Sequence, residues 1–193
     1  MDLRRTVSNR ITSPLVPALS RLGLTPNMVS WIGLVITFVA AVFTGMGNLL
    51  VGGILILVAG LFDILDGALA RYSNKASPAG ALLDSTFDRI SEAALLLGLL
   101  VYNLRGEANF IITVLIFVAL IASFLVSYIR ARAEGLGVDC KVGLFTRAER
   151  VIILALGLLA GQVLIVIAVI AFFSSVTVIQ RFIYAYRKAR EKV

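Results

Sequence analysis

The sequence predicts an all-α integral membrane protein, a bundle of six transmembrane helices preceded by an amphipathic helix at the membrane surface. Hydrophobic residues make up 60% of the 193 residues and charged residues 15%, and the mean hydropathy is +0.99. Soluble domains are less apolar and carry more charge. Apolar runs recur from residue 28 onward, and a chain of this length suits a single domain over residues 1–193.

Each transmembrane helix needs about 20 apolar residues. The expected spans are residues 28–46, 49–72, 80–104, 108–133, 144–160 and 162–186. The last apolar stretch is too long for one span, so we divide it at Gly161. The fifth expected span must then begin inside the semi-polar segment GLFTRAER.

The segment before the first span, residues 3–22, mixes basic side chains with aliphatic ones such as Ile11, Leu15 and Leu19. This mixture is typical of a helix lying in the headgroup plane, and a flexible basic tail is the alternative. No secretory signal is evident in this region.

Lys and Arg are concentrated in the N-terminal segment and after the second, fourth and sixth spans. The opposite connections GMGN and LLAGQ have none, and NLRGEAN has only Arg105. The positive-inside rule therefore predicts a multi-pass protein of the cell membrane with both termini in the cytoplasm. The net charge of +7 fits loops that face anionic lipid or bind an anionic substrate, rather than nucleic acid.

The residue inventory excludes several chemistries. The chain has no histidine, which rules out imidazole catalysis and histidine-ligated metals. Cys140 is the only cysteine, so neither an intramolecular disulfide nor a cysteine-rich metal site can form, and we interpret it as an ordinary loop residue.

Four aspartates interrupt otherwise apolar segments. Asp63 and Asp66 are three residues apart near the end of the second span, and Asp84 and Asp88 are four apart near the start of the third. Both spacings put a pair on one helix face. The short loop RYSNKASPAG makes the two helices antiparallel neighbours, so the four carboxylates can converge just inside the cytoplasmic boundary.

Such a cluster needs a positive partner, because one Asp in apolar surroundings costs about 2.5–3.5 kcal/mol. Arg71 and Arg89 could pair with one or two of the carboxylates. An oxygen-ligated divalent cation suits all four better, with Mg²⁺ first and Mn²⁺ or Ca²⁺ as substitutes. Gly67, Ala70 and Gly80 keep the neighbouring faces small enough for a bulky phosphorylated ligand.

Two classes of protein fit these features: a metal-dependent enzyme at the membrane surface, and a cation transporter or channel. Transporters place their acidic residues near the bilayer midplane, often in broken helices. Here the acidic residues lie at one end, beside basic loops, which favours the enzyme.

The acidic segment follows the pattern D-x2-D-G-x2-A-R-x8-G-x3-D-x3-D, which resembles the signature of the CDP-alcohol phosphotransferase family. All eight letters are present, at Asp63, Asp66, Gly67, Ala70, Arg71, Gly80, Asp84 and Asp88. The resemblance covers the whole chain and implies an interfacial helix, six spans and a cytoplasm-facing active site. It also implies a homodimer, and a reaction in which a CDP-linked lipid donates its phosphatidyl-type group to an alcohol and releases CMP.

The resemblance assigns roles to individual residues. Asp63, Asp66 and Asp84 would ligate the metal, while Asp88 would contact the metal site and act as general base. The residues expected to bind the CDP-lipid are Pro26, Asn27, Met28, Val29, Asp63, Gly67, Ala70, Arg71, Ser77, Gly80 and Asp84. For Ser77 and the segment Pro26 to Val29, a helix-capping role at membrane entry is the alternative.

The acceptor is suggested by the stretch SYIRARAEGLGVDCKVGLFTRAER and by TVIQR, which resemble the inositol-phosphate branch of the prokaryotic enzymes. Arg binds phosphate bidentately, so a guanidinium cluster suits a phosphate-bearing acceptor. The residues expected to bind that phosphate are Arg130, Arg132, Arg147, Arg150 and Arg181. We expect inositol phosphate as acceptor, with glycerol 3-phosphate second; the donor is CDP-diacylglycerol or CDP-archaeol.

Overall fold

The computed structural model describes residues 15–74 and 77–191, and within these residues all regular secondary structure is helical. The all-α prediction is therefore confirmed. Residues 15–21 form a short helix, while the rest of the interfacial helix expected over residues 3–22 lies outside the described residues. The long helices are α2 (Pro26–Gly45), α3 (Leu49–Tyr72), α4 (Pro78–Arg105), α5 (Phe110–Gly135), α6 (Arg147–Leu159) and α7 (Val163–Arg190).

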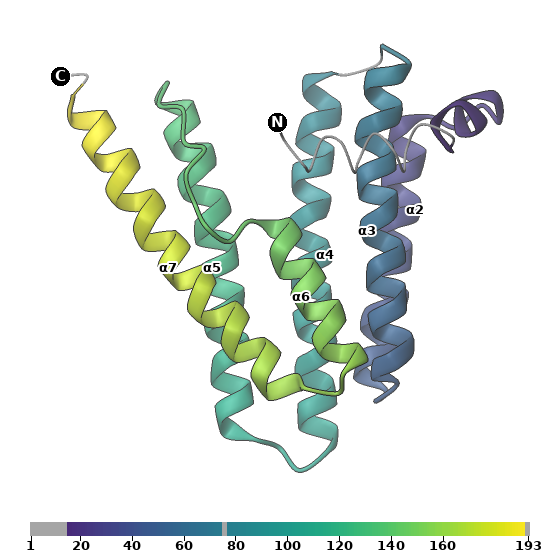
Figure 1. Ribbon diagram of the computed structural model, residues 1–193, viewed down its shortest axis with the longest axis vertical. Helices are drawn as coiled ribbons and strands as arrows, with labels where there is room; N and C mark the ends of the chain where they lie inside the picture. Colours follow the sequence, from purple (N-terminus) through teal and green to yellow (C-terminus); the bar gives the residue numbers. More distant parts are fainter. Residues whose placement is uncertain (1–14, 75–76, 192–193) are drawn as a thin grey trace.

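The helices form two groups, which α6 and the packing of α4 against α5 connect. Helix α2 packs against both α3 and α4, α5 packs along α7, and α6 lies against both α3 and α7 (Figure 1). The α3–α4 connection and the C-terminal ends of α5 and α7 lie at the same end of the bundle (Figure 1). Helix α6 begins well below that end, so the chain after α5 turns back toward the middle of the bundle.

Two helices begin at a cap followed by proline. The side chain of Thr25 accepts a hydrogen bond from the Met28 amide, and Pro26 occupies the first turn of α2. Ser77 likewise caps α4 ahead of Pro78. Ser and Thr satisfy amides that have no partner inside the helix, and proline loses nothing at the first position. Both helices consequently start two residues before the expected spans 28–46 and 80–104.

Helix α6 is shorter than the expected span 144–160, because the chain before it is anchored to α7. The Leu144 amide donates to the side chain of Gln180 at 3.3 Å, and the Phe145 amide donates to Thr177 at 3.2 Å. A capping box between Thr146 and Glu149 then starts the helix. The result is a 13-residue helix, about 20 Å long.

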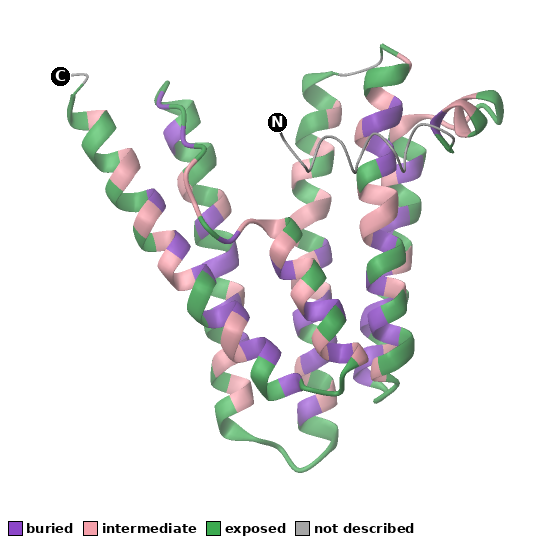
Figure 2. Ribbon diagram, viewed as in Figure 1, coloured by how far each residue is buried: buried purple, intermediate pink, exposed green. Residues whose placement is uncertain are grey.

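Four helices, α2, α3, α5 and α7, are long and apolar enough to cross a membrane. Helix α4 is long, but its first half carries Asp84, Asp88, Arg89 and Glu92. Many large apolar side chains on the outward faces of the bundle are exposed, as lipid contact requires (Figure 2). The chain is therefore a membrane protein.

Glycines permit close contacts between several of the described helices. A Cβ added at Gly98 on α4 would overlap the carbonyl oxygen of Ala41 on α2. Gly52 lies equally close to Thr44, and Gly53 lies against Leu159 of α6. At these positions close packing inside one bundle explains the glycine.

Candidate metal and phosphate site

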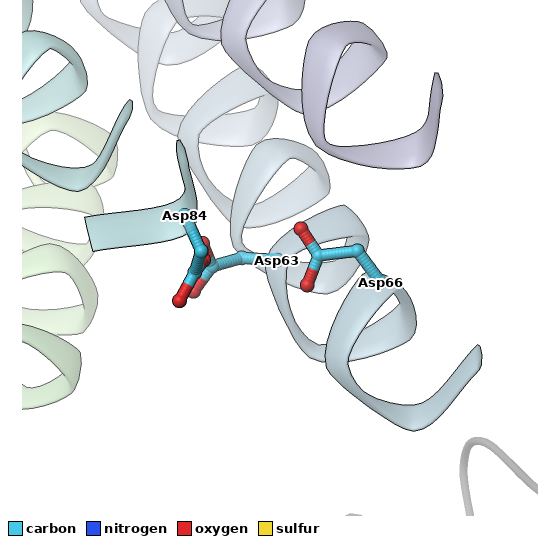
Figure 3. Close-up of side chains that lie close together, drawn as sticks. All are labelled: Asp63, Asp66 and Asp84. Atoms are coloured by element: carbon cyan, nitrogen blue, oxygen red, sulfur yellow. The ribbon is translucent and has the colours of Figure 1, made fainter. Parts of the chain in front are cut away.

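Three of the four predicted aspartates meet between α3 and α4. Asp63, Asp66 and Asp84 each offer a carboxylate oxygen, and these oxygens lie within 4.8 Å of one another (Figure 3). The i, i+3 spacing of the α3 pair turns both side chains toward the first turns of α4. Ser30 of α2 donates a hydrogen bond of 2.6 Å to Asp66, whose side chain is buried, and so fixes the direction of that carboxylate.

The donor set fits a hard divalent cation. All three groups offer oxygen, which Mg²⁺ and Mn²⁺ prefer, and the described residues near the site contribute neither sulfur nor imidazole. Three carboxylates this close repel one another strongly at the edge of a low-dielectric interior. A bound cation would relieve that repulsion, so the residues present match the metal implied by the sequence pattern.

Asp88 lies beside this group but is held by arginines. Nη1 of Arg147 is 2.8 Å from Oδ1 of Asp88 and 2.7 Å from Oδ2 of Asp63. Arg89 approaches Asp88 at 3.5 Å. The Oδ1 atom of Asp88 is buried and, among the described residues, has this ion pair but no well-directed hydrogen bond. One oxygen of Asp88 is therefore held in place by charge alone, beside the metal-binding group.

Residues expected to bind the CDP-lipid gather at the helix starts next to the carboxylates. A Cβ added at Gly80 would lie 3.2 Å from Oγ of Ser77 and 3.9 Å from Oδ1 of Asn27. The first turns of α2 and α4, which carry residues expected to bind the CDP-lipid, therefore lie close together. At Gly67 the missing side chain leaves room for Arg71, whose Nη1 would lie 3.5 Å from an added Cβ.

The four residues expected at the start of α2 do not present equivalent side chains. Val29 is fully buried and packs in a small core with Leu65 and Leu69, so its side chain is not available to a ligand. Asn27 and Met28 are exposed, and Pro26 forms the first turn. Of the four, Asn27 thus offers the one side chain with hydrogen-bonding groups.

A cavity of about 300 Å³ is lined in part by Asp63 and Asp88, and we call it the arginine cavity. Its lining includes Asp63, Asp88, Arg89, Ser127, Arg130, Thr146, Arg147, Arg150 and Arg181. Four of the five arginines expected to bind the acceptor phosphate are therefore brought together. Arg132 is exposed on α5 and does not line the cavity.

The arginines of the cavity differ in how their N–H groups are used. Arg150 is buried and binds Glu92 of α4 with both Nε and Nη2, the latter at 3.0 Å, while Nη1 donates to the Phe145 carbonyl. Arg181 is also buried, and donates to the carbonyls of Val126 and Val142 at 2.6 and 2.9 Å.

Arg130, by contrast, is half exposed, and its Nε donates to Glu134 at 2.8 Å. The remaining N–H groups of its guanidinium are available to an anion in the arginine cavity.

Cys140 packs in a small buried cluster with Ala133 and Val138 at the α5–α6 connection. Burial raises the pKa of its thiol, so the thiolate needed for reactivity is disfavoured. From the sequence we interpret Cys140 as an ordinary loop residue; it does lie in the connection between α5 and α6, and its side chain is buried there.

Two residues of the site were absent from the sequence-based prediction. Glu92 continues the Asp84 and Asp88 series by one more helical turn, a spacing visible in the sequence. Ser30 had no comparable signal, because its partnership with Asp66 depends on how α2 packs against α3.

The fold and the site together define a helical membrane protein in which three carboxylates that fit a divalent cation lie beside an arginine-lined cavity. The model of the CDP-alcohol phosphatidyltransferase family matches residues 23–183. The chain belongs to this family and is a CDP-alcohol phosphatidyltransferase of phospholipid biosynthesis.

The chain resembles enzymes from archaea and bacteria over most of their length. It is 34% identical to an archaetidylinositol phosphate synthase of Methanothermobacter thermautotrophicus, over 96% of this chain and 94% of that protein. It is 37% identical to a phosphatidylinositol phosphate synthase of Mycobacteroides abscessus, over 80% of this chain and 71% of that one.

Solved structures of a related enzyme are similar to this chain in fold. The crystal structure of Mycobacterium tuberculosis phosphatidylinositol phosphate synthase with CDP-DAG bound superposes with a TM-score of 0.85 at 33% identity, covering 92% of this chain and 94% of that one. A structure of the same enzyme in complex with manganese and citrate gives a TM-score of 0.83 at 32% identity, covering 91% and 88%.

Proposed function

We propose that this enzyme transfers a phosphatidyl or archaetidyl group from a CDP-linked lipid to inositol phosphate, releasing CMP. The observation that carries the proposal is the arginine cavity, which adjoins the acidic group and offers guanidinium donors to an acceptor with its own phosphate. The relatives named as inositol phosphate synthases support the same acceptor. Glycerol 3-phosphate, a smaller phosphate ester, is the second candidate.

Each group of site residues has its own role in the proposed reaction. The acceptor hydroxyl attacks the lipid-bearing phosphorus, the bond to the CMP oxygen breaks, and the hydroxyl proton passes to the Asp88 carboxylate. Asp63, Asp66 and Asp84 would hold Mg²⁺, which neutralises charge on the pyrophosphate when bound. Arg147, ion-paired with both Asp63 and Asp88, would lie between the base and the acceptor phosphate.

The donor would enter beside the starts of α2 and α4, where the residues expected to bind the CDP-lipid gather. We also propose six spans, with the short α6 completing the bundle against α3 and α7, and with the site and both termini on the cytoplasmic side of the cell membrane. The basic residues near the ends of α5 and α7 support that orientation. A homodimer is part of the same proposal.

The test is an acceptor panel with purified protein in nanodiscs. CDP-diacylglycerol and CDP-archaeol are each combined with inositol phosphate, glycerol 3-phosphate or free inositol, and CMP release is measured. We expect turnover with inositol phosphate, little with free inositol, loss of activity in EDTA and recovery with added Mg²⁺. Turnover with glycerol 3-phosphate alone would replace the acceptor and leave the transferase chemistry intact.

A cation transporter is the alternative from a different class. Liposomes containing the protein should show no ion flux above empty liposomes while CMP release proceeds. Flux that persists in the Asp88→Asn variant would support transport.

A further inference from the structure

Glu92 is the most buried carboxylate near the site that the proposed reaction does not use. Its side chain is 11% exposed, and it lies one helical turn beyond Asp88 on the same face of α4. It is outside the eight-residue sequence pattern. A charge in this position needs a partner, and Glu92 has one in Arg150 of α6, whose side chain is 3% exposed.

The Glu92–Arg150 pair joins two helices whose backbones have few direct contacts. Helix α6 packs along α3 and α7, whereas a cavity of about 290 Å³ lies between α6 and α4. Both Glu92 and Arg147 line this cavity. Helices α4 and α6 are linked by the ion pair of Arg150 with Glu92 and by the ion pair of Arg147 with Asp88.

The geometry of the pair fixes α6 in direction as well as distance. Both oxygens of Glu92 accept from two different nitrogens of Arg150, and the third nitrogen donates to the carbonyl of Phe145, just before α6. A bidentate contact of this kind allows one orientation of the guanidinium plane. Arg147 lies three residues before Arg150, on the same side of the first turn of α6.

We propose that Glu92 is a positioning residue: by holding Arg150, it fixes the first turn of α6 and thereby places the Arg147 guanidinium against Asp88 and the arginine cavity. Glu92 itself touches no reacting group. The inference rests on the proposed function only in the choice of acceptor used to measure it.

Two substitutions distinguish the effect of the reach of the Glu92 side chain from the effect of its charge. Glu92→Gln keeps the size of the side chain but removes its charge, while Glu92→Asp keeps the charge but is one methylene too short for the bidentate contact. We expect each to lower kcat/KM for the acceptor at least tenfold, with the KM for CDP-lipid within twofold of wild type. Wild-type kinetics in Glu92→Asp would overturn the proposal.

A double-mutant cycle with Arg147→Gln tests whether Glu92 acts through Arg147. If it does, the double variant Glu92→Gln with Arg147→Gln has a kcat/KM less than about threefold below that of Arg147→Gln alone. The reason is that the guanidinium of Arg147, which Glu92 is proposed to position, is already absent. Losses that multiply in full would show an independent structural role and overturn the proposal.

If Glu92→Gln folds poorly, the double variant Glu92→Leu with Arg150→Met removes both buried charges. Its thermal midpoint should return toward wild type while kcat/KM for the acceptor stays low, and recovery of both would count against positioning.

A final measurement is independent of catalysis. Ala148 is exposed beside Arg147, so a cysteine introduced there in a Cys140→Ala background reports on the first turn of α6 through its maleimide-labelling rate. We expect labelling at least threefold faster when Glu92→Gln or Glu92→Asp is added. An unchanged rate overturns the positioning role whichever acceptor the enzyme uses, whereas inactivity of the wild type toward both phosphate acceptors would overturn only the proposed function.

Discussion

Replacing Arg130 by alanine should weaken acceptor binding without disturbing the fold. In this structure Arg130 loses only an exposed i, i+4 ion pair with Glu134, a type of contact worth about 0–1 kcal/mol. The same change removes a guanidinium that lines the arginine cavity. A lost charge-assisted contact costs about 1.5–3 kcal/mol, which corresponds to roughly ten- to a hundredfold in affinity.

The assay is the initial rate of CMP release against inositol phosphate concentration at saturating CDP-lipid. Arg130→Ala should raise the KM for inositol phosphate by that factor and leave the KM for CDP-lipid nearly unchanged. Arg132→Ala is the matched control, because Arg132 lies two residues further along α5 and outside the cavity. If both variants raise the acceptor KM equally, or neither does, the assignment of the arginine cavity to the acceptor phosphate is refuted.

Arg150→Ala is a less selective probe than the sequence alone suggests. The sequence predicts a rise in acceptor KM and little else. In the structure, however, this change leaves Glu92 as a buried carboxylate without its partner, and breaking a buried pair costs about 3–5 kcal/mol. We therefore expect Arg150→Ala to lower the thermal midpoint as well as acceptor binding.

Two further predictions concern the carboxylates and the helix packing. The Asp88→Asn variant should bind CDP-lipid normally but turn over orders of magnitude more slowly, whereas Asp66→Asn should also weaken donor binding. Calorimetric titration with the donor and CMP-release assays distinguish the two variants. Near-normal turnover in Asp88→Asn would remove the role of Asp88 as base. Gly98→Ala should destabilise the protein by about 1–3 kcal/mol, since the added Cβ overlaps the Ala41 carbonyl, while Gly135→Ala meets open space and should leave the thermal midpoint unchanged or raised.

The acidic group was predictable because its determinants are local. The spacings of Asp63 to Asp66 and of Asp84 to Asp88 depend only on the helical period, and the connection between the two helices is short. The short connection brings the side chains of α3 and α4 to one depth, while α2, which packs against both helices, holds the two side by side.

The partners of the carboxylates were predictable only in part. The sequence offers Arg71 and Arg89 as neighbours, and Arg89 does approach Asp88 at 3.5 Å. The shorter contacts come from Arg147, which is 84 residues beyond Asp63. That contact depends on α6 packing against α3, and no local pattern encodes the packing.

The boundary of α6 was missed for a similar reason. The segment VGLF reads as apolar and continuous with the helix that follows, yet its amides are paired with side chains of α7. Gly143, with φ of +134°, lies against Thr177 and Arg181, where any side chain would collide. Hydrophobicity cannot distinguish a buried anchored loop from a helical turn, since both bury apolar residues.

The charge of the arginine cavity also predicts how it discriminates between acceptors. Five arginines and two aspartates line it, so the lining side chains carry an excess of three positive charges. A phosphate monoester carries about −1.5 to −2 at neutral pH and would offset much of that excess, whereas free inositol would offset none of it. Inorganic phosphate should therefore compete with inositol phosphate in CMP-release assays and raise its apparent KM, with little effect on the apparent KM for CDP-lipid. Competition against CDP-lipid instead would place the anion at the donor side, and the arginine cavity would lose its assignment.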